Sequence, residues 1–159
     1  MITYTAKERA DWFDGLHKRA SAAGIMCETA DGRLLIVKAN YKPHWTIPGG
    51  LIDPGETPLE GAIRETVEEV GIDVSSDRAS FVYVANRQSE FAHTYQFVFH
   101  TIVSDEEIAS IKLQASEIDE YDLVTKETVL SNDRYYGKAI RNWAEDITGY
   151  TEQDLSEKG

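Results

Sequence analysis

A chain of 159 residues, of which 42% are hydrophobic, can close one well-filled core and is too short for two ordinary domains, so we expect a single domain over residues 1–159. The formal net charge of −12 argues against binding to duplex nucleic acid, and no apolar stretch reaches the roughly 18 residues of a membrane span, so we expect no membrane partner. Because Cys27 is the only cysteine, an internal disulfide is excluded and a cysteine-ligated zinc site is disfavoured, which favours a cytoplasmic location.

The first part of the chain predicts a helix followed by a β-hairpin. Thr5 and Glu8 have the spacing of a capping box, which predicts a short helix that ends near Arg19. Two strands are expected over residues 24–28 and 34–37, because they flank an Asp-Gly turn. The second of these strands is apolar throughout, so we expect it to be buried.

The segment 41–55 is predicted to be a shaped loop. It holds three of the four prolines and three glycines, with a brief strand expected over residues 45–47. Loops of this composition often carry function, because glycine lets the backbone approach an ion or a phosphate closely.

A helix is expected between Thr57 and Gly71. Thr57 is suited to the N-cap, Pro58 to the first helical position and Glu60 to the third, while Gly71 supplies the stop. The side expected to face the core consists of Leu59, Ala62, Ile63, Thr66, Val67 and Val70.

The rest of the chain mixes strands and helices. The expected elements are strands over residues 79–85, 94–103 and 121–124, a helical turn over 105–111 and a C-terminal helix over 133–148. That helix would place Tyr136, Ile140 and Trp143 on one side, and the polar tail from about residue 151 is expected to be mobile. This mixture predicts the α/β or α+β class.

Three acidic side chains share one face of the helix that follows the loop. Glu65, Glu68 and Glu69 fall within an arc of roughly 100°, where each like-charged pair at i,i+3 or i,i+4 costs about 0.2 to 0.5 kcal/mol. They also lie near the negative end of the helix dipole, which disfavours anions. One interpretation is a solvated acidic face, with Arg64 bridging Glu60 and Glu68, and the other is a set of carboxylate ligands for Mg²⁺.

The loop and the helix together carry a motif. Gly50, five residues, Glu56, seven residues and then the run from Arg64 to Ile72 resemble the Nudix box of the MutT-like Nudix hydrolases. Thr66 departs from the family pattern, which has a bulky aliphatic residue there, and we expect a slight loosening without loss of chemistry. The resemblance implies an α/β fold of the Nudix type, an α/β/α sandwich with a mixed β-sheet between helices.

The resemblance also implies a reaction. Nudix enzymes are Mg²⁺-dependent hydrolases, with Mn²⁺ as a substitute, and the leading substrate here is a small nucleotide, either a nucleoside triphosphate or another nucleoside diphosphate derivative cleaved at a diphosphate linkage. A homodimer is left open. The alternative is a catalytically silent nucleotide-binding or sensor module, but such a module has no need of three repelling carboxylates. Another reaction on this fold, such as isopentenyl diphosphate isomerisation, would need an extra cysteine and glutamate pair, and Cys27, the only thiol, lies far upstream.

Site residues follow from the motif by resemblance. The implied metal ligands are the Gly50 carbonyl, Glu65, Glu68 and Glu69. The implied catalytic residues are Glu65, as ligand or as base toward water, Arg64, paired with Glu56, and Glu117, a glutamate from outside the box. Glu120, in the same segment, is the other candidate for the last role, with Glu90 behind both, and for each of these three acids a solvated loop position is the alternative.

Contacts to the rest of the substrate are less constrained. The segment 86–88 lacks the proline and the tyrosine that mark two Nudix subgroups, so neither ADP-ribose nor a dinucleoside polyphosphate is favoured. Basic side chains that can meet phosphates are Arg33, Lys38, Lys42 and Arg87, although surface cations are usually only solvated. Aromatic side chains that can stack on a base, or belong to the core, are Tyr41, Trp45, Tyr83, Phe91 and Tyr95.

Overall fold

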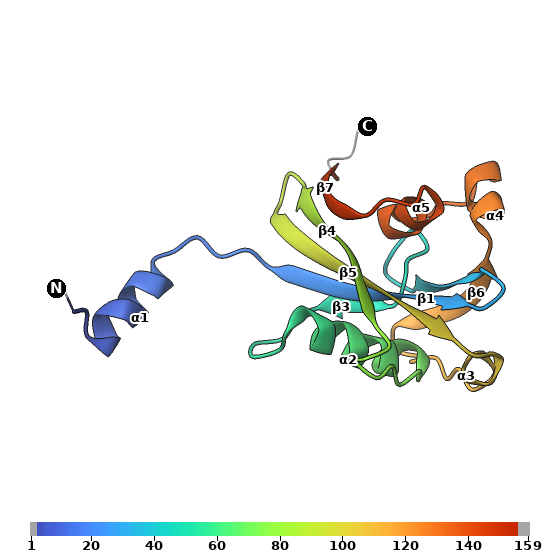
Figure 1. Cartoon of the computed structure of the whole chain (residues 1–159). Coiled ribbons are helices and arrows are strands. Elements are labelled where there is room, and N and C mark those ends of the chain that lie inside the picture. The colour runs from blue at the N-terminus through green and yellow to red at the C-terminus, as the bar shows by residue number, and fades with distance from the viewer. Residues whose placement is uncertain (1–2, 156–159) are drawn as a thin grey trace.

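A computed structural model describes residues 3–155, in which a seven-stranded sheet lies between helices (Figure 1). The strands are β1 (Ser21–Thr29), β2 (Leu34–Ala39), β3 (Gly49–Leu51), β4 (Ser80–Gln88), β5 (His93–Val103), β6 (Ile118–Val124) and β7 (Gly149–Asp154). The helices are α1 (Ala6–Asp14), α2 (Pro58–Val70), α3 (Asp105–Ala109), α4 (Lys126–Ser131) and α5 (Lys138–Ala144).

The sheet is mixed, as the resemblance implied. Its strands follow the order β6-β2-β1-β5-β4-β7, and the short β3 pairs with β1 beside this path. β1 runs parallel to β5 and β4 runs parallel to β7, whereas the β1–β2, β2–β6 and β4–β5 pairs are antiparallel. Gly32, with a φ of 81°, turns the chain between β1 and β2, which confirms the predicted hairpin.

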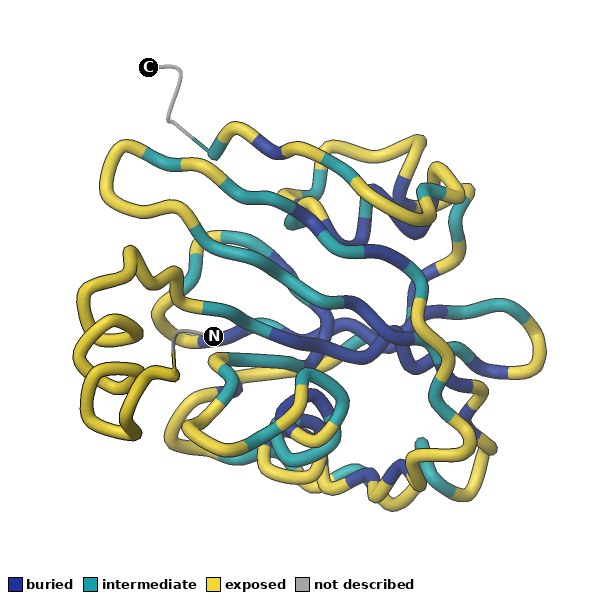
Figure 2. The backbone as a smooth tube through the Cα atoms, turned by 60° about the vertical axis from the view of Figure 1, so that its left-hand side comes forward, coloured by how far each residue is buried: buried dark blue, intermediate teal, exposed yellow. Residues whose placement is uncertain are grey.

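Each face of the sheet has its own hydrophobic core, seen as the dark tube in Figure 2. One core joins β1, β2 and β5 to α2 and includes Ile25 and Val70. The other joins the opposite face to α4 and α5 and includes Met26 and Trp143. Ile25 and Met26 belong to different cores because successive side chains of a strand point to opposite faces. The α/β/α sandwich is therefore confirmed.

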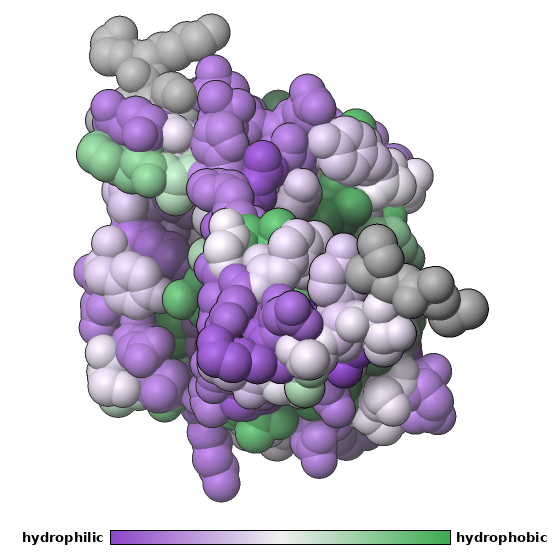
Figure 3. All heavy atoms as spheres, turned by 90° about the vertical axis from the view of Figure 1, so that its left-hand side faces the viewer, coloured by the Kyte–Doolittle hydropathy of each residue, from purple (hydrophilic) through white to green (hydrophobic). Residues whose placement is uncertain are grey.

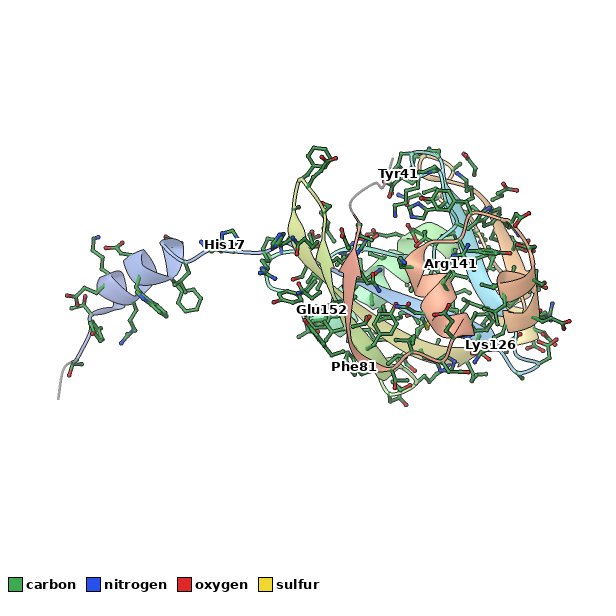
Figure 4. The ribbon with its side chains drawn as sticks, turned by 90° about the horizontal axis from the view of Figure 1, so that it is seen from above. His17, Tyr41, Phe81, Lys126, Arg141 and Glu152 are labelled. Atoms are coloured by element: carbon green, nitrogen blue, oxygen red, sulfur yellow. The ribbon has the colours of Figure 1, made fainter. Side chains whose placement is uncertain are left out.

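The N-terminal helix stands apart from this sandwich. α1 projects on an extended arm, where Figure 4 labels His17, and none of the residues of α1 is buried. The capping box of Thr5 and Glu8 is formed as predicted, but the helix ends at Asp14 rather than near Arg19. The end of the molecule that carries the arm is largely hydrophilic, with hydrophobic side chains showing only in patches (Figure 3).

The C-terminal helix is shorter than predicted. Residues 133–148 were expected to form one helix, but α5 spans only Lys138–Ala144, and α4 precedes it. Gly137 has an extended backbone and caps α5, and Asp146, with a φ of 56°, turns the chain after it. The three apolar side chains expected on the inner side, Tyr136, Ile140 and Trp143, are nevertheless buried.

The tail expected to be mobile is partly a strand, so that prediction is wrong for residues 151–154. β7 runs parallel to β4, with Gln153 opposite Arg87. A polar edge strand is held by backbone hydrogen bonds to its neighbour, which its own composition does not reveal. Residues 156–159 lie outside the described part. Among the described helices, none is long and apolar enough to cross a membrane.

Two of the three described helices with a capping box form it from Thr and Glu in different surroundings, which allows a matched test. The Thr57 hydroxyl accepts a hydrogen bond from the Glu60 N–H at 3.3 Å on α2, which packs on a core. The Thr5 hydroxyl accepts one from the Glu8 N–H at 3.2 Å on α1, which buries nothing. We expect Thr57→Ala to lower the free energy of unfolding in urea by about 1 kcal/mol and Thr5→Ala to leave it unchanged. Equal losses would show that α1 belongs to the cooperative core.

Candidate functional site

The glycine-rich loop is held against the sheet. β3 pairs with β1 so that Gly50 lies opposite Ala23, and the Ile25 N–H donates to the Pro48 carbonyl at 3.1 Å. The brief strand predicted over residues 45–47 is wrong in position, since that segment makes only isolated bridges and the strand follows it. The pairing with β1 thus fixes the turn that faces α2.

Gly50 lies against Glu65 of α2. A β-carbon on Gly50 would be 2.5 Å from both Cδ and Oε1 of Glu65 and 2.7 Å from Oε2. The absence of a side chain at Gly50 therefore makes room for the carboxylate. Glu65 and the backbone of Gly50, both expected at the metal site, are brought into direct proximity.

Arg64 joins the loop to the helix. Its Nε and Nη2 donate to the two carboxylate oxygens of Glu56 at 2.7 and 3.0 Å, and Nη2 also donates to the Leu51 carbonyl at 2.9 Å. Its Nη1 donates to Glu65 at 2.8 Å and to Glu68 at 3.2 Å. The hydrogen bonds that Arg64 donates to Glu56 and Glu65 raise the pKa of its guanidinium. The pairing with Glu56 that the resemblance implied is confirmed.

Glu69 is the buried member of the acidic group. Only 2% of it is exposed, and its Oε2 accepts a hydrogen bond from the Gly49 N–H at 2.9 Å. Burial raises the pKa of Glu69 to about 7, the Gly49 bond and Lys42 counteract this rise, and Glu65 and Glu117 add to it. A carboxylate in such a place is stabilised when a metal ion binds beside it.

α2 is turned further toward the loop than its sequence pattern predicts. Val67 was assigned to the core side but is 42% exposed, whereas Glu69 is buried. Gly61 allows the loop to come close, because a β-carbon there would lie 3.2 Å from Glu56 and 3.5 Å from Ile52. The loop as well as the sheet therefore covers the helix, and this places a carboxylate inside.

Among the acids expected from outside the motif, Glu117 is brought to the site. Its charge raises the pKa of Glu69, so the two carboxylates lie within reach of each other's field. The segment that carries it is fastened to the end of α2 by the Gln114 N–H, which donates to the Glu69 carbonyl at 3.1 Å. Glu120 instead lies on β6, and Glu90 lies in the turn between β4 and β5.

The acidic side chains of the motif are not arranged around a common point. Among residues 3–155, no three Asp, Glu, His or Cys side chains are placed as ligands of a single ion. Glu65 and Glu68 turn to Arg64 instead, because its charge relieves their repulsion. The donors still fit Mg²⁺, since they are hard oxygen atoms and the Glu68 side chain, 48% exposed, can rotate toward Glu65.

The aromatic and basic side chains that were candidates for contacts with the rest of the substrate lie partly in the core and partly on the surface. Trp45 and Tyr83 are buried, whereas Tyr41 and Phe91 are exposed, and Figure 4 shows Tyr41 at the periphery of the molecule. No base-stacking wall is therefore evident from these four. Among the basic candidates, Lys42 is the one whose charge acts on Glu69, which a reading of the sequence could not establish.

A comparison with known proteins identifies a family model that matches most of this chain. The NUDIX domain model matches residues 18–145 of this chain. The chain is 34% identical over 85 residues to diphosphoinositol polyphosphate phosphohydrolase 3-alpha of Mus musculus, covering 54% of this chain and 51% of that protein. It is 36% identical over 83 residues to a MutT-like protein of Streptomyces ambofaciens, covering 52% and 53%. The chain thus spans about half the length of these curated relatives.

Solved structures share the fold at low identity. The NUDIX domain of Shewanella oneidensis NrtR, complexed with ADP ribose, aligns with a TM-score of 0.70 at 14% identity, over 90% of this chain and 96% of that one. The MutT protein of Methanosarcina mazei Go1 aligns with a TM-score of 0.67 at 24% identity, over 82% of this chain and 94% of that one. An Ap4A hydrolase of C. elegans aligns with a TM-score of 0.63 at 20% identity, over 80% of this chain and 93% of that one.

Two glycine substitutions separate the site from the scaffold. In Gly50→Ala the new β-carbon meets the mobile end of Glu65, so we expect the fold to persist while Mg²⁺ affinity falls about 10- to 100-fold. In Gly24→Ala it meets the Pro48 carbonyl, at 2.7 Å, so we expect a loss of about 1 to 3 kcal/mol in the free energy of unfolding. Calorimetric Mg²⁺ titration and urea denaturation measure the two effects, and unchanged Mg²⁺ binding by Gly50→Ala would contradict the assignment.

The burial of Glu69 predicts a pH dependence of stability. Its pKa is about 7 in the folded, metal-free protein, above the ordinary 4.5, so the folded state holds a proton that the unfolded chain releases. The free energy of unfolding should therefore fall as pH rises from about 4.5 to 8. Glu69→Gln should remove this fall. With EDTA present, the free energy of unfolding of Glu69→Gln should exceed that of the parent protein by about 1 to 3 kcal/mol at pH 8, and the two values should be equal near pH 5. A difference independent of pH would contradict the burial argument.

Proposed function

We propose that this chain, which belongs to the Nudix family because the NUDIX domain model matches residues 18–145, cleaves a diphosphate linkage in a nucleoside triphosphate or another nucleoside diphosphate derivative. The observation that carries this proposal is the buried Glu69 under the Gly49 amide, beside a Glu65 that rests on Gly50. Carboxylates held against a glycine turn suit a cation and the phosphate oxygens that it binds. The likeness to a phosphohydrolase and to an Ap4A hydrolase supports the same reaction class.

The proposed cofactor is Mg²⁺, with Mn²⁺ as a substitute. The residues that would hold it are the Gly50 carbonyl, Glu65, Glu68 and Glu69. When bound, such an ion neutralises charge on phosphoryl oxygens and makes a coordinated water more acidic. Arg64 keeps the loop against the helix through Nε and Nη2, which donate to Glu56 and to the Leu51 carbonyl. Since Glu65 and Glu68 accept from Nη1 alone, they could turn to an ion without loss of these loop contacts.

The proton of the attacking water needs an acceptor. We assign this role to Glu65 if it does not ligate the ion, because its carboxylate on α2 lies directly against Gly50 of the glycine turn. Glu117 is the proposed additional acid, since its charge acts on Glu69 from outside the motif. Arg64 holds the helix carboxylates in place and neutralises part of their charge.

The proposed partner is a small nucleotide, in the cytoplasm, without duplex nucleic acid or a membrane. A homodimer is also proposed, because Trp12 and Phe13 on the projecting α1 are each more than 60% exposed and a short helix gains stability from packing. Light scattering of the purified chain tests this, and a monomeric mass at all concentrations would contradict it.

Glu69→Gln tests the site. The amide keeps the size of the side chain and an acceptor for the Gly49 N–H but removes the charge, so we expect kcat/KM with Mg²⁺ to fall by roughly 10²-fold or more while circular dichroism stays unchanged. The control is Glu106→Gln, which removes an exposed charge from α3 and should keep full activity. Near-full Mg²⁺-dependent activity of Glu69→Gln would refute the assignment.

A substrate panel tests the reaction. It contains nucleoside triphosphates, nucleotide sugars, dinucleoside polyphosphates and a diphosphoinositol polyphosphate, each with Mg²⁺ and with the products identified. Cleavage of a diphosphate linkage in a nucleotide is the expected result. Tight binding without cleavage of any member would instead indicate a nucleotide-binding module.

A further inference from the structure

Polar side chains without partners gather on the α5 side of the sheet. Within the described residues, the buried side-chain nitrogen and oxygen atoms that lack a hydrogen bond are Tyr83 Oη, Arg87 Nε, Thr101 Oγ1, Asn142 Nδ2 and Gln153 Oε1 and Nε2. Except for Thr101, these residues belong to three adjoining elements, β4, β7 and α5. Because buried polar groups are nearly always paired with protein, water or a ligand, such a concentration marks a region where a polar ligand can bind.

The fold explains why these residues meet. Tyr83, Ala85 and Arg87 are two residues apart along β4, so their side chains point to the same face of the strand. Ala85 belongs to the core on the α5 side, so this face is the one that α5 covers. Gln153 of β7 lies directly opposite Arg87 in the parallel pair. Asn142 is buried on α5, which covers this face. Figure 4 looks onto it, with Arg141 marking α5 and Glu152 marking β7.

Tyr83 and Asn142 are neighbours whose mutual contact is weak. Burial raises the pKa of Tyr83 to about 12, and a hydrogen bond with the Asn142 side chain lowers it. By strict distance and angle, neither Tyr83 Oη nor Asn142 Nδ2 has a partner among the described residues. Because an amide carries two N–H groups, Asn142 retains a donor for a further acceptor.

Arg87 is a partly buried cation without an anion. It has no ion pair or hydrogen bond with any described residue, and burial lowers its pKa. The arginines that do pair with carboxylates are Arg33, Arg64, Arg78 and Arg134. In a chain of net charge −12 an acidic partner is not scarce, so the guanidinium of Arg87 has been left available.

Further cations connect Arg87 to the acidic site. The pKa of His44 is lowered first by burial and then by the charges of Lys42, Arg87 and Lys38. Lys42 in turn acts on Glu69. The charge of Lys42 is therefore felt at the acidic site and also at His44, where the charge of Arg87 is felt, on a protein that is otherwise strongly acidic.

We propose that Arg87, with Gln153 opposite it on β7, binds an anionic oxygen group, a phosphate or a carboxylate, that the substrate carries away from the linkage that is cleaved. This inference rests on the proposed function, because it assigns the second end of the same substrate. A guanidinium donates two parallel hydrogen bonds to either group, and the Gln153 amide can donate as well. The substrate class is thus a diphosphate with an additional anion.

Matched substrate pairs test the proposal and separate the two sources of charge. NADH and NADPH differ by one phosphate, and UDP-glucose and UDP-glucuronate differ by one carboxylate. The parent protein should have a KM about tenfold or more lower for the anionic member of at least one pair, with a similar kcat. Arg87→Gln should abolish this preference, Arg87→Lys should keep part of it, and Arg9→Gln, on the exposed α1, should keep it all.

A second measurement does not depend on turnover. With EDTA present, inorganic phosphate should raise the Tm of the parent protein above its value in chloride of equal ionic strength, and Arg87→Gln should lose this rise. If the phosphate effect holds but no nucleotide is hydrolysed, the proposed reaction fails and the anion site stands. If hydrolysis occurs with equal KM within both pairs and phosphate has no effect, the anion site fails and the reaction stands.

Gln153→Glu is a second variant that tests the anion site even if Arg87→Gln does not fold. It places a carboxylate opposite Arg87, which should pair with the guanidinium and stabilise the fold while excluding the substrate anion. We expect the same loss of preference and of the phosphate effect as in Arg87→Gln. Retention of both by Gln153→Glu would overturn the proposal.

Discussion

The close approach of a glycine turn to an acidic helix is the constraint on which this site depends. Gly50 leaves the space that the Glu65 carboxylate occupies, and the Gly49 amide donates to Glu69. Arg64 fastens the same turn through Glu56 and the Leu51 carbonyl. Since the turn contributes backbone atoms to two of these contacts, its pairing with β1 matters as much as the side chains of α2.

That approach also explains how the chain tolerates its own charge pattern. Glu65 and Glu68 share the Nη1 of Arg64, whose positive charge relieves the repulsion between the two carboxylates. The departure at Thr66 is accommodated inside the helix, because the side chain is fully buried and its hydroxyl donates to the Ala62 carbonyl at 2.8 Å. A Thr at this position therefore leaves no polar atom unpaired.

Acidic and basic groups are separated across the sheet. The carboxylates belong to α2 on one face, whereas Arg87 belongs to the opposite face under α5. Lys42 comes from the loop between β2 and β3, and its charge acts on Glu69 and on His44 of the same loop. The proposed cation site and the proposed anion site can thus coexist on a chain whose net charge would repel a phosphate ester.

The sequence by itself determined the elements whose causes are local. Thr57, Glu60 and Gly71 delimit α2, and the turn at Gly32 closes the hairpin, because caps and turns depend on interactions a few residues apart. Only the tertiary structure decided the burial of Glu69, the shorter α5, the edge strand β7 and the convergence on Arg87. These features depend on which distant segments pack together, and neither periodicity nor composition within one segment specifies its neighbour in space.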